Sequence, residues 1–198
     1  LKALINNNMK PVCAVTQPDK PRGRGYKLMP PEVKVAAEEN GIPVYQPETL
    51  KNGELQPILE EYKPDIIAVV AYGKLLPEYV LNFPKYGCVN MHASLLPKYR
   101  GAAPVQWAVI NGDEYSGVTT MMMEKGLDTG DMLLSERVKI GEYETSEQLF
   151  ERISALGAEV LCRTILNIET IKPIPQRDED HTYAPMLTKE MGKIDWNK

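Results

Sequence analysis

Short β-branched apolar runs alternate with helical patterns along the first half of the chain, and this order constrains the fold more than any other feature. The runs are VCAVT from Val12, IIAVVAY from Ile66 and CVNMH from Cys88. Each run is too short for a helix and is bounded by Gly or Pro, which is typical of buried parallel strands. Helical patterns stand between them, in EVKVAAEEN and GELQPILEEY. The alternation therefore predicts βαβ units, in which ligands bind beyond the carboxyl ends of the strands.

The second half of the chain adds a hairpin and one long helix. GVTTMMME and DMLLSERVKI are strand-like runs joined by the polar connection KGLDTG. Thr145 and Gln148 form a capping box, and an apolar stripe from Leu149 to Ile165, which includes Phe150, has helical spacing and is assigned to the core. The complete order predicts an α/β, Rossmann-like fold with an open, mostly parallel sheet, helices on both faces and a late antiparallel hairpin.

Composition bounds the class of protein. The chain has 198 residues, of which 43% are hydrophobic and 25% charged, and this is typical of one globular domain with a sizeable core. The longest apolar stretch, IIAVVAYG, is far shorter than the roughly 20 residues that cross a bilayer, so no membrane partner is expected. Three widely spaced cysteines favour a reducing compartment. With a net charge of -4, any nucleic-acid contact needs a local basic patch.

Asn90 and His92 stand at the end of the third apolar run. Two residues apart on a strand, they project from one face where the sheet opens to solvent. An asparagine inside an apolar run lowers stability unless its amide has a hydrogen-bond partner, so its presence there favours a functional role. Asp128 in GLDTGD is the third candidate, because Gly126 and Gly130 let the backbone approach a ligand closely. The structural alternative is a histidine held by a carbonyl, with Asn and Asp as turn residues.

These three residues do not predict a metal site. One His and one Asp with no second His nearby make a poor ligand set.

The loop DKPRGRGYK concentrates positive charge. Its four cations stand within eight residues with no acid among them: Lys20, Arg22, Arg24 and Lys27. Such a loop is commonly just solvated. In a chain with a net negative charge it is still the best candidate for phosphate contacts, to which Lys98 and Arg100 are expected to add.

Long motifs of the chain resemble a known family. NMHASLLPKYRGAAPVQWAVINGD and GVTTMMMEKGLDTGDML closely resemble the formyltransferases that use 10-formyltetrahydrofolate. Residues 15–47 are similar to the branch of that family that formylates methionyl-tRNA. The similarity covers nearly the whole chain.

The resemblance implies a role for each group of residues. Asn90, His92 and Asp128 form the catalytic set: an amide and a protonated imidazole bind the formyl oxygen, and a carboxylate holds the imidazolium or orders a proton-relaying water. Folate contacts are implied for Tyr72, Gly73, Lys74, Leu75 and Leu76, and for Ser94, Leu95, Leu96 and Pro97. The basic loop is implied to reach the acceptor arm of initiator methionyl-tRNA. No metal is implied, and a monomer in a bacterial-type cytoplasm is expected.

The resemblance also predicts how the chain is organised. Residues 1–170 correspond to the catalytic domain without the strand that normally opens it, and residues 171–198 to an extended tail or linker towards a C-terminal β-barrel domain. Two other readings stay open. The same three residues would serve formyl transfer to glycinamide ribonucleotide or an amino sugar, against which the basic loop argues. An inactive fragment that only binds folate or RNA is the other.

We predict that Arg24→Ala weakens the use of methionyl-tRNA, because a phosphate contact is lost, and leaves folate binding nearly unchanged. Steady-state kinetics at varied tRNA concentration measure the effect. Unchanged kinetics for the tRNA would contradict a role of this loop in tRNA binding.

Overall fold

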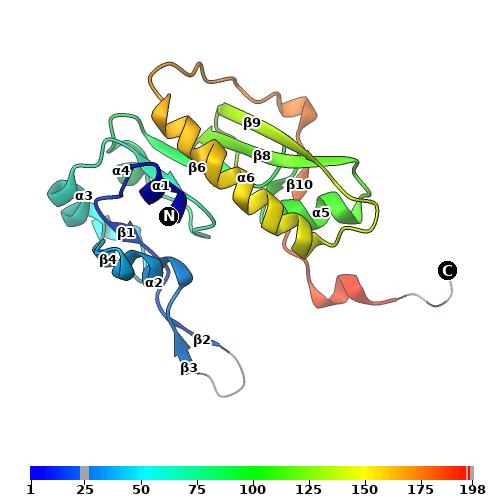
Figure 1. Ribbon diagram of the computed structural model, residues 1–198, viewed down its shortest axis with the longest axis horizontal. Coiled ribbons are helices and arrows are strands. Elements are labelled where there is room, and N and C mark those ends of the chain that lie inside the picture. Colours follow the sequence, from blue (N-terminus) through cyan, green and yellow to red (C-terminus); the bar gives the residue numbers. More distant parts are fainter. Residues whose placement is uncertain (23–26, 195, 197–198) are drawn as a thin grey trace.

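The computed structural model describes residues 1–22, 27–194 and 196, and its helices and strands follow one another in mixed order along the chain (Figure 1). The helices are α1 (Lys2–Asn6), α2 (Glu32–Glu39), α3 (Gln56–Tyr62), α4 (Glu78–Leu81), α5 (Pro104–Ile110) and α6 (Ser146–Leu166), with short 3-10 turns η1 (Lys51–Gly53), η2 (Asp178–Asp180) and η3 (Lys189–Gly192). The strands are β1 (Ala14–Val15), β2 (Lys20–Arg22), β3 (Lys27–Met29), β4 (Val44–Tyr45), β5 (Ile67–Val69), β6 (Cys88–His92), β7 (Arg100–Gly101), β8 (Tyr115–Met122), β9 (Met132–Lys139) and β10 (Tyr183–Ala184).

The largest sheet has the order β5-β6-β8-β9. β5 and β6 are parallel and connected through α4, and β8 and β9 form the antiparallel hairpin expected from the sequence. β6 and β8 are also antiparallel, so β5–β6 is the parallel pair of this sheet. A second parallel pair, β1–β4, forms a separate two-stranded sheet. The α/β fold class predicted from the order of elements is confirmed.

The two faces of β6 are covered by different helices. Val89 and Met91 face α6, which comes close because its Gly157 has no side chain: a Cβ there would lie 2.7 Å from the Met91 sulfur. Cys88 points the opposite way, into a cluster with residues of α3 and α4. Burial raises the pKa of the Cys88 thiol to about 12, so the thiol stays protonated and acts as a small apolar group. Alternation along β6 therefore divides the core into two layers.

β5 differs from the sequence expectation. The run from Ile66 was expected to be a buried strand, yet Ala68 is exposed and Val70 is 47% exposed. β5 is the edge strand of the four-stranded sheet, so its outer side has no neighbouring strand among the described residues. Its position at the edge explains the exposure.

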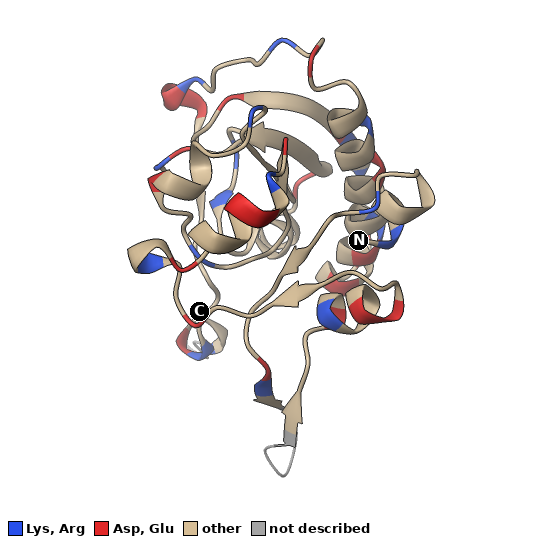
Figure 2. Ribbon diagram, turned by 90° about the vertical axis from the view of Figure 1, so that its left-hand side faces the viewer, with Lys and Arg blue, Asp and Glu red and all other residues tan. Residues whose placement is uncertain are grey.

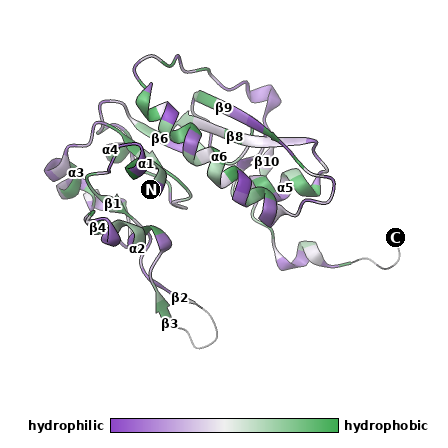
Figure 3. Ribbon diagram, viewed as in Figure 1, coloured by the Kyte–Doolittle hydropathy of each residue, from purple (hydrophilic) through white to green (hydrophobic). Residues whose placement is uncertain are grey.

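The long helix α6 begins and packs as its sequence predicts. The Thr145 side chain caps it by accepting a hydrogen bond from the Gln148 backbone N–H, and the Gln148 side chain accepts one from the Thr145 backbone N–H. Leu149 and Ile153 are fully buried, while hydropathy alternates along the outer surface of the helix (Figure 3). Phe150 is 53% exposed, because it lies one position off the buried stripe.

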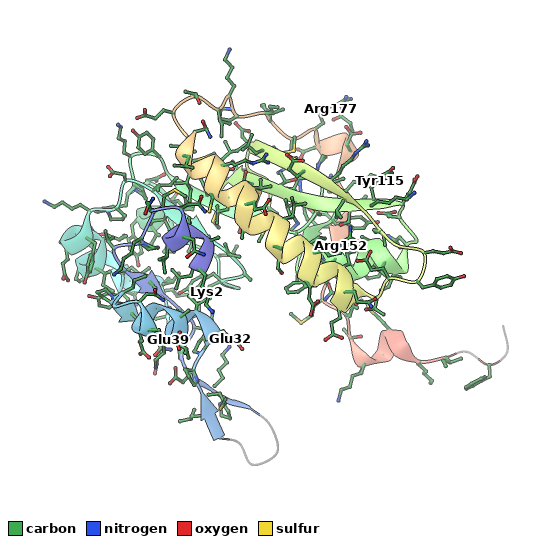
Figure 4. The ribbon with its side chains drawn as sticks, viewed as in Figure 1. Lys2, Glu32, Glu39, Tyr115, Arg152 and Arg177 are labelled. Carbon is green, nitrogen blue, oxygen red and sulfur yellow. The ribbon has the colours of Figure 1, made fainter. Side chains whose placement is uncertain are left out.

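A salt bridge joins the end of the hairpin to the start of α6. Arg152 of α6 (Figure 4) donates to the Glu144 carboxylate at 2.7 Å and to the Lys139 carbonyl at 3.2 Å. Hydrogen bonds from the Gly141 backbone and from Arg152 lower the pKa of Glu144.

No helix among the described residues is long and apolar enough to span a bilayer.

We predict that Gly117→Ala destabilises the protein by about 1–3 kcal/mol through overpacking, with a lower melting temperature in thermal unfolding. A Cβ at this β8 position would lie 2.2 Å from the Glu136 carbonyl oxygen and 2.6 Å from Leu95 Cδ2. Gly192→Ala is the matched control, because a Cβ there meets nothing within 4 Å. Equal melting temperatures for the two variants would contradict this packing.

Candidate active site

Asn90 and His92 project from the same face of β6, as their spacing predicts. Their neighbours Val89 and Met91 take the other face, against α6. Asn90 pairs in register with Met121 of β8 and is half-buried. Among the described residues its side-chain amide makes no hydrogen bond, so the cost of placing it in an apolar strand is not offset locally. Its donor group is thus available at the surface of the site.

His92 is only 5% exposed, and each of its ring nitrogens faces a different partner. Nε2 lies 2.8 Å from the carbonyl oxygen of Tyr99, and Nδ1 lies 3.6 Å from Oδ2 of Asp128. Because a carbonyl only accepts, Nε2 carries a proton, and in the neutral ring Nδ1 is the unprotonated nitrogen. The distance of 3.6 Å suits an ion pair but exceeds a hydrogen bond. A proton on Nδ1, when present, is therefore available to another acceptor that lies in the plane of the ring.

Asp128 reaches His92 by an unexpected route. Val89 pairs with Met122, so β8 ends beside the start of β6, whereas His92 is at the other end of that strand. The β8–β9 loop must fold back across the sheet to bring Asp128 to His92. Its carboxylate then accepts a hydrogen bond from the Gly101 N–H at 2.9 Å. This bond fixes the carboxylate against the loop that follows His92.

The glycines of the Asp128 loop serve the chain's own packing. A Cβ on Gly130 would lie 1.8 Å from the Met122 carbonyl oxygen, and one on Gly126 would lie 2.0 Å from Thr129 Oγ1. The sequence suggested instead that these glycines admit a ligand. Asp128 itself has φ +54°, in the left-handed region that few residues other than glycine adopt.

The Ser94–Pro97 segment is held in the protein by both side-chain and backbone contacts. Ser94 Oγ donates to the Lys98 carbonyl at 2.6 Å, and the Leu96 N–H donates to Thr119 Oγ1 at 3.1 Å. Leu96 is buried, and Leu95 lies over Gly117. The peptide bond between Leu96 and Pro97 is cis. These contacts position the loop beside His92.

The Tyr72–Leu76 segment follows β5 directly. Val69 pairs with Asn90, so the segment leaves the sheet beside the site. Lys74 Nζ donates to the Glu48 carbonyl at 2.7 Å, while Gly73 is open and Leu75 is 67% exposed. The two remaining residues, Tyr72 and Leu76, pack on the cluster around α3 and α4.

Tyr72 carries an unpartnered polar atom. Its hydroxyl is shielded from solvent and has no hydrogen-bond partner within the part of the chain that the structure describes. Burial raises its pKa, so it stays a donor at neutral pH. A buried hydroxyl of this kind costs stability unless a ligand pairs with it.

The basic loop forms the hairpin β2–β3, which projects away from the rest of the chain (Figures 1 and 2). Lys20 is exposed on β2, and Arg22 pairs in register with Lys27. Arg24 lies outside the described residues.

A polar network fixes the base of this hairpin. Lys34 Nζ lies 3.0 Å from the Asp19 carboxylate, and Gln46 donates to the same group at 2.8 Å. Hydrogen bonds from Gln46 and Lys34 lower the pKa of Asp19. Gln17 extends the network by donating to the Tyr72 carbonyl at 2.8 Å.

The prediction that Arg100 adds to the basic surface is wrong. Lys98, which is predicted to do the same, is exposed. Arg100 is 2% exposed, and its guanidinium donates to Gln176 Oε1 at 2.9 Å and to the Asp178 carboxylate at 3.2 Å. Its charge is satisfied internally, so it contributes nothing to a surface patch.

Sequence reasoning missed the backbone groups and the tail residue that hold the site. The Tyr99 carbonyl and the Gly101 N–H carry no signal in a sequence, because every residue has such groups. Gln176 donates to the carbonyls of Asp128 and Gly130 at 2.9 and 2.8 Å, from a segment without helical or strand periodicity.

One cavity lies away from these residues. It has a volume of about 380 Å³ and lies at the start of β6, where it is lined by Leu81, Tyr86, Met122, Ile168 and others. No residue predicted to bind folate or tRNA lines it. Within the described ranges, no three His, Cys, Asp or Glu residues are arranged to hold a metal ion.

Comparison with known proteins gives one consistent family. The sequence profile described as "Formyl transferase" matches residues 1–165. The chain is 52% identical to the methionyl-tRNA formyltransferase of Caldanaerobacter subterraneus subsp. tengcongensis, over 99% of the chain and 64% of that protein. It is also 52% identical to the methionyl-tRNA formyltransferase of Alkaliphilus oremlandii, over 100% of the chain and 64% of that protein. The chain thus spans about 64% of the length of these relatives.

Solved structures share the fold at lower identity. Phosphoribosylglycinamide formyltransferase from Bacillus halodurans has a TM-score of 0.71 and 23% identity, covering 85% of this chain and 89% of that one. The N-formyltransferase from Helicobacter canadensis, solved with folinic acid and dTDP-3-aminofucose, has a TM-score of 0.68 and 22% identity, covering 93% of this chain and 65% of that one. At this identity the likeness establishes the fold alone.

Proposed function

Because the chain belongs to the formyl transferase family, we propose that it carries the active site for formyl transfer from 10-formyltetrahydrofolate to the α-amino group of initiator methionyl-tRNA. The relatives at 52% identity bear the corresponding name. The observation that carries the proposal is the approach of His92 Nδ1 to Asp128 Oδ2 at 3.6 Å, on the face of β6 that also bears Asn90. Since the chain spans 64% of those relatives, the activity is proposed for the full-length protein.

The proposed chemistry is direct acyl transfer, in which 10-formyltetrahydrofolate supplies the formyl carbon. As the methionine amine attacks this carbon, negative charge develops on the formyl oxygen. The tetrahedral intermediate then collapses: the bond between the formyl carbon and N10 breaks, and N10 takes up the proton that the amine has lost. The Asn90 amide donates to that oxygen, and so does His92 through Nδ1, because Nε2 is already bonded to the Tyr99 carbonyl. Fixed donors of this kind are each worth about 100-fold to 1000-fold in turnover.

Asp128 completes the set as the carboxylate that holds the imidazolium. It is kept in place by the Gly101 N–H, so its position does not depend on the protonation of His92. It also orders a water that relays the proton of the attacking amine to N10 of the folate. A free α-amino group titrates near about 7.7–8.0, so a useful fraction is neutral at working pH and no covalent enzyme intermediate is needed.

The Tyr72–Leu76 segment fits a folate slot. The unpartnered Tyr72 hydroxyl, the open backbone at Gly73 and the exposed Leu75 offer a donor, room and an apolar surface. They follow Val69, the residue that pairs with Asn90. Lys74 is tied to the Glu48 carbonyl, so we assign it to shaping the segment. The side chains of Ser94 and Leu96 are used internally, so the second folate segment, Ser94–Pro97, is proposed to contact folate through Leu95, Pro97 and the backbone.

The projecting hairpin is the proposed contact for the tRNA acceptor arm. Lys20 is exposed on it, and Arg22, Arg24 and Lys27 complete its charge. Because initiator methionyl-tRNA is its proposed substrate, the protein is proposed to act in the cytoplasm of a bacterial cell. Action as a monomer stays a prediction, which sedimentation of the full-length protein measures.

We predict that His92→Ala and Asp128→Asn each lower formylation of methionyl-tRNA by about 100-fold or more. The first variant removes a donor to the developing oxyanion, and the second removes the carboxylate that holds the imidazolium and orders the relay water. Turnover is measured with 10-formyltetrahydrofolate as donor. The control is His181→Ala, which removes the other histidine of the chain. Full activity in both site variants would contradict the proposed mechanism.

The acceptor is tested in the same assay with glycinamide ribonucleotide and an amino sugar nucleotide in place of methionyl-tRNA. The proposal expects formylation of methionyl-tRNA alone. If the protein formylates a small amine preferentially and His92→Ala abolishes that reaction, the proposed mechanism stands but methionyl-tRNA is not the acceptor.

A further inference from the structure

Gln176 lies in the segment that follows α6, and it alone of residues 172–180 is not exposed. It stands outside the part of the chain that the family profile matches, residues 1–165. Its side chain nevertheless reaches both loops of the candidate active site. Nε2 donates to the carbonyls of Asp128 and Gly130, and Oε1 accepts from Arg100 Nε at 2.9 Å.

The chemistry of its partners fixes the orientation of this amide. A guanidinium only donates, so the oxygen of Gln176 must face Arg100. Carbonyls only accept, so the nitrogen must face Asp128 and Gly130. The amide is therefore fully used on its two sides, with one side for each loop.

The contact matters because the Asp128 loop is held far from where its strand ends. The loop folds back across the sheet, and Asp128 has a left-handed backbone with φ +54°. This conformation costs free energy for a non-glycine residue, and contacts with its surroundings offset that cost. The two hydrogen bonds from Gln176 pin the carbonyls of residues 128 and 130, on either side of the turn.

On its other side Gln176 supports the loop that follows His92. Arg100 is buried between Gln176 and Asp178. It is flanked by Tyr99, whose carbonyl binds His92, and by Gly101, whose N–H binds the Asp128 carboxylate. One side chain thus braces both partners of the His92–Asp128 pair.

We propose that Gln176 is a positioning residue, which sets the Asp128 carboxylate against His92 by pinning the carbonyls of residues 128 and 130. The inference rests on the proposed function, in which Asp128 acts through His92. It gives the segment after α6 the role of supporting the proposed active site.

Docking of that segment has other anchors, so the two roles can be separated. Strand β10 pairs with β7, Trp107 Nε1 donates to the Pro185 carbonyl at 2.8 Å, and Ile174 bridges to Met132. Loss of the Gln176 donors alone leaves all of these in place.

Gln176→Glu tests the proposal in the full-length protein. The carboxylate keeps the acceptor for Arg100 and removes both donors to the Asp128 loop. We expect kcat for methionyl-tRNA formylation to fall by about 10- to 100-fold, since small misplacements of a reacting group have effects of this size. KM for methionyl-tRNA stays within the error of the wild type, because the β2–β3 hairpin is untouched. Gln176→Met, which removes donors and acceptor at similar size, is the second variant and should be at least as slow.

Amide hydrogen exchange gives a readout independent of activity. The Arg100 and Ala102 N–H groups bind the carbonyls of Thr182 and Ala184, whereas the Gly101 N–H between them binds Asp128. In Gln176→Glu, exchange at Gly101 should speed up while Arg100 and Ala102 stay protected. The matched control Trp107→Phe removes a tail anchor and should leave kcat and Gly101 exchange unchanged.

Unchanged kcat in Gln176→Glu, or unchanged exchange at Gly101, overturns the proposal. So does equal acceleration at residues 100, 101 and 102, which would mean that the tail has merely come loose. A wild-type protein that fails to formylate methionyl-tRNA would count against the proposed acceptor instead. The kcat comparison is then made with the amine that is formylated, and the Gly101 readout stands as before.

Discussion

A hydrogen bond from the Gly101 N–H to the Asp128 carboxylate joins the two loops on which the proposed active site depends. The antiparallel register places the end of β8 beside the start of β6, so the intervening loop has to fold back to reach His92. Gln176 holds the backbone of this loop, but the carboxylate itself needs a partner that fixes its direction. The backbone N–H of Gly101 supplies that partner, because the other side of β7 is already paired with β10.

The histidine is held by the same loop. Tyr99 turns its carbonyl to Nε2 and leaves Nδ1 facing Asp128, so the backbone of residues 99–101 sets both members of the pair. Asn90 is positioned without a loop contact, because the alternation of side chains along β6 places it on the same face as His92. The site therefore combines one side chain placed by secondary structure with two placed by loop contacts.

The segment after α6 links the site to residues far along the chain. The boundary at residue 170 stays a prediction, yet Gln176 and β10 contact the loops around Asp128 and Arg100. Arg177 beside them points to the surface near η2 (Figure 4). Adjacent residues of one segment thus have opposite surroundings, with Gln176 facing the site and Arg177 facing solvent.

The sequence by itself determined the α/β order, the late hairpin, the capped helix α6 and the family, because periodicity, caps and motif spacing are local properties of a chain. It also determined that Asn90 and His92 share a face. Only the tertiary structure decided that β5 lies at an edge, that Arg100 is buried, and that Tyr99, Gly101 and Gln176 hold the site. Those facts depend on backbone groups common to every residue and on contacts between distant segments, and neither leaves a periodic trace in the sequence.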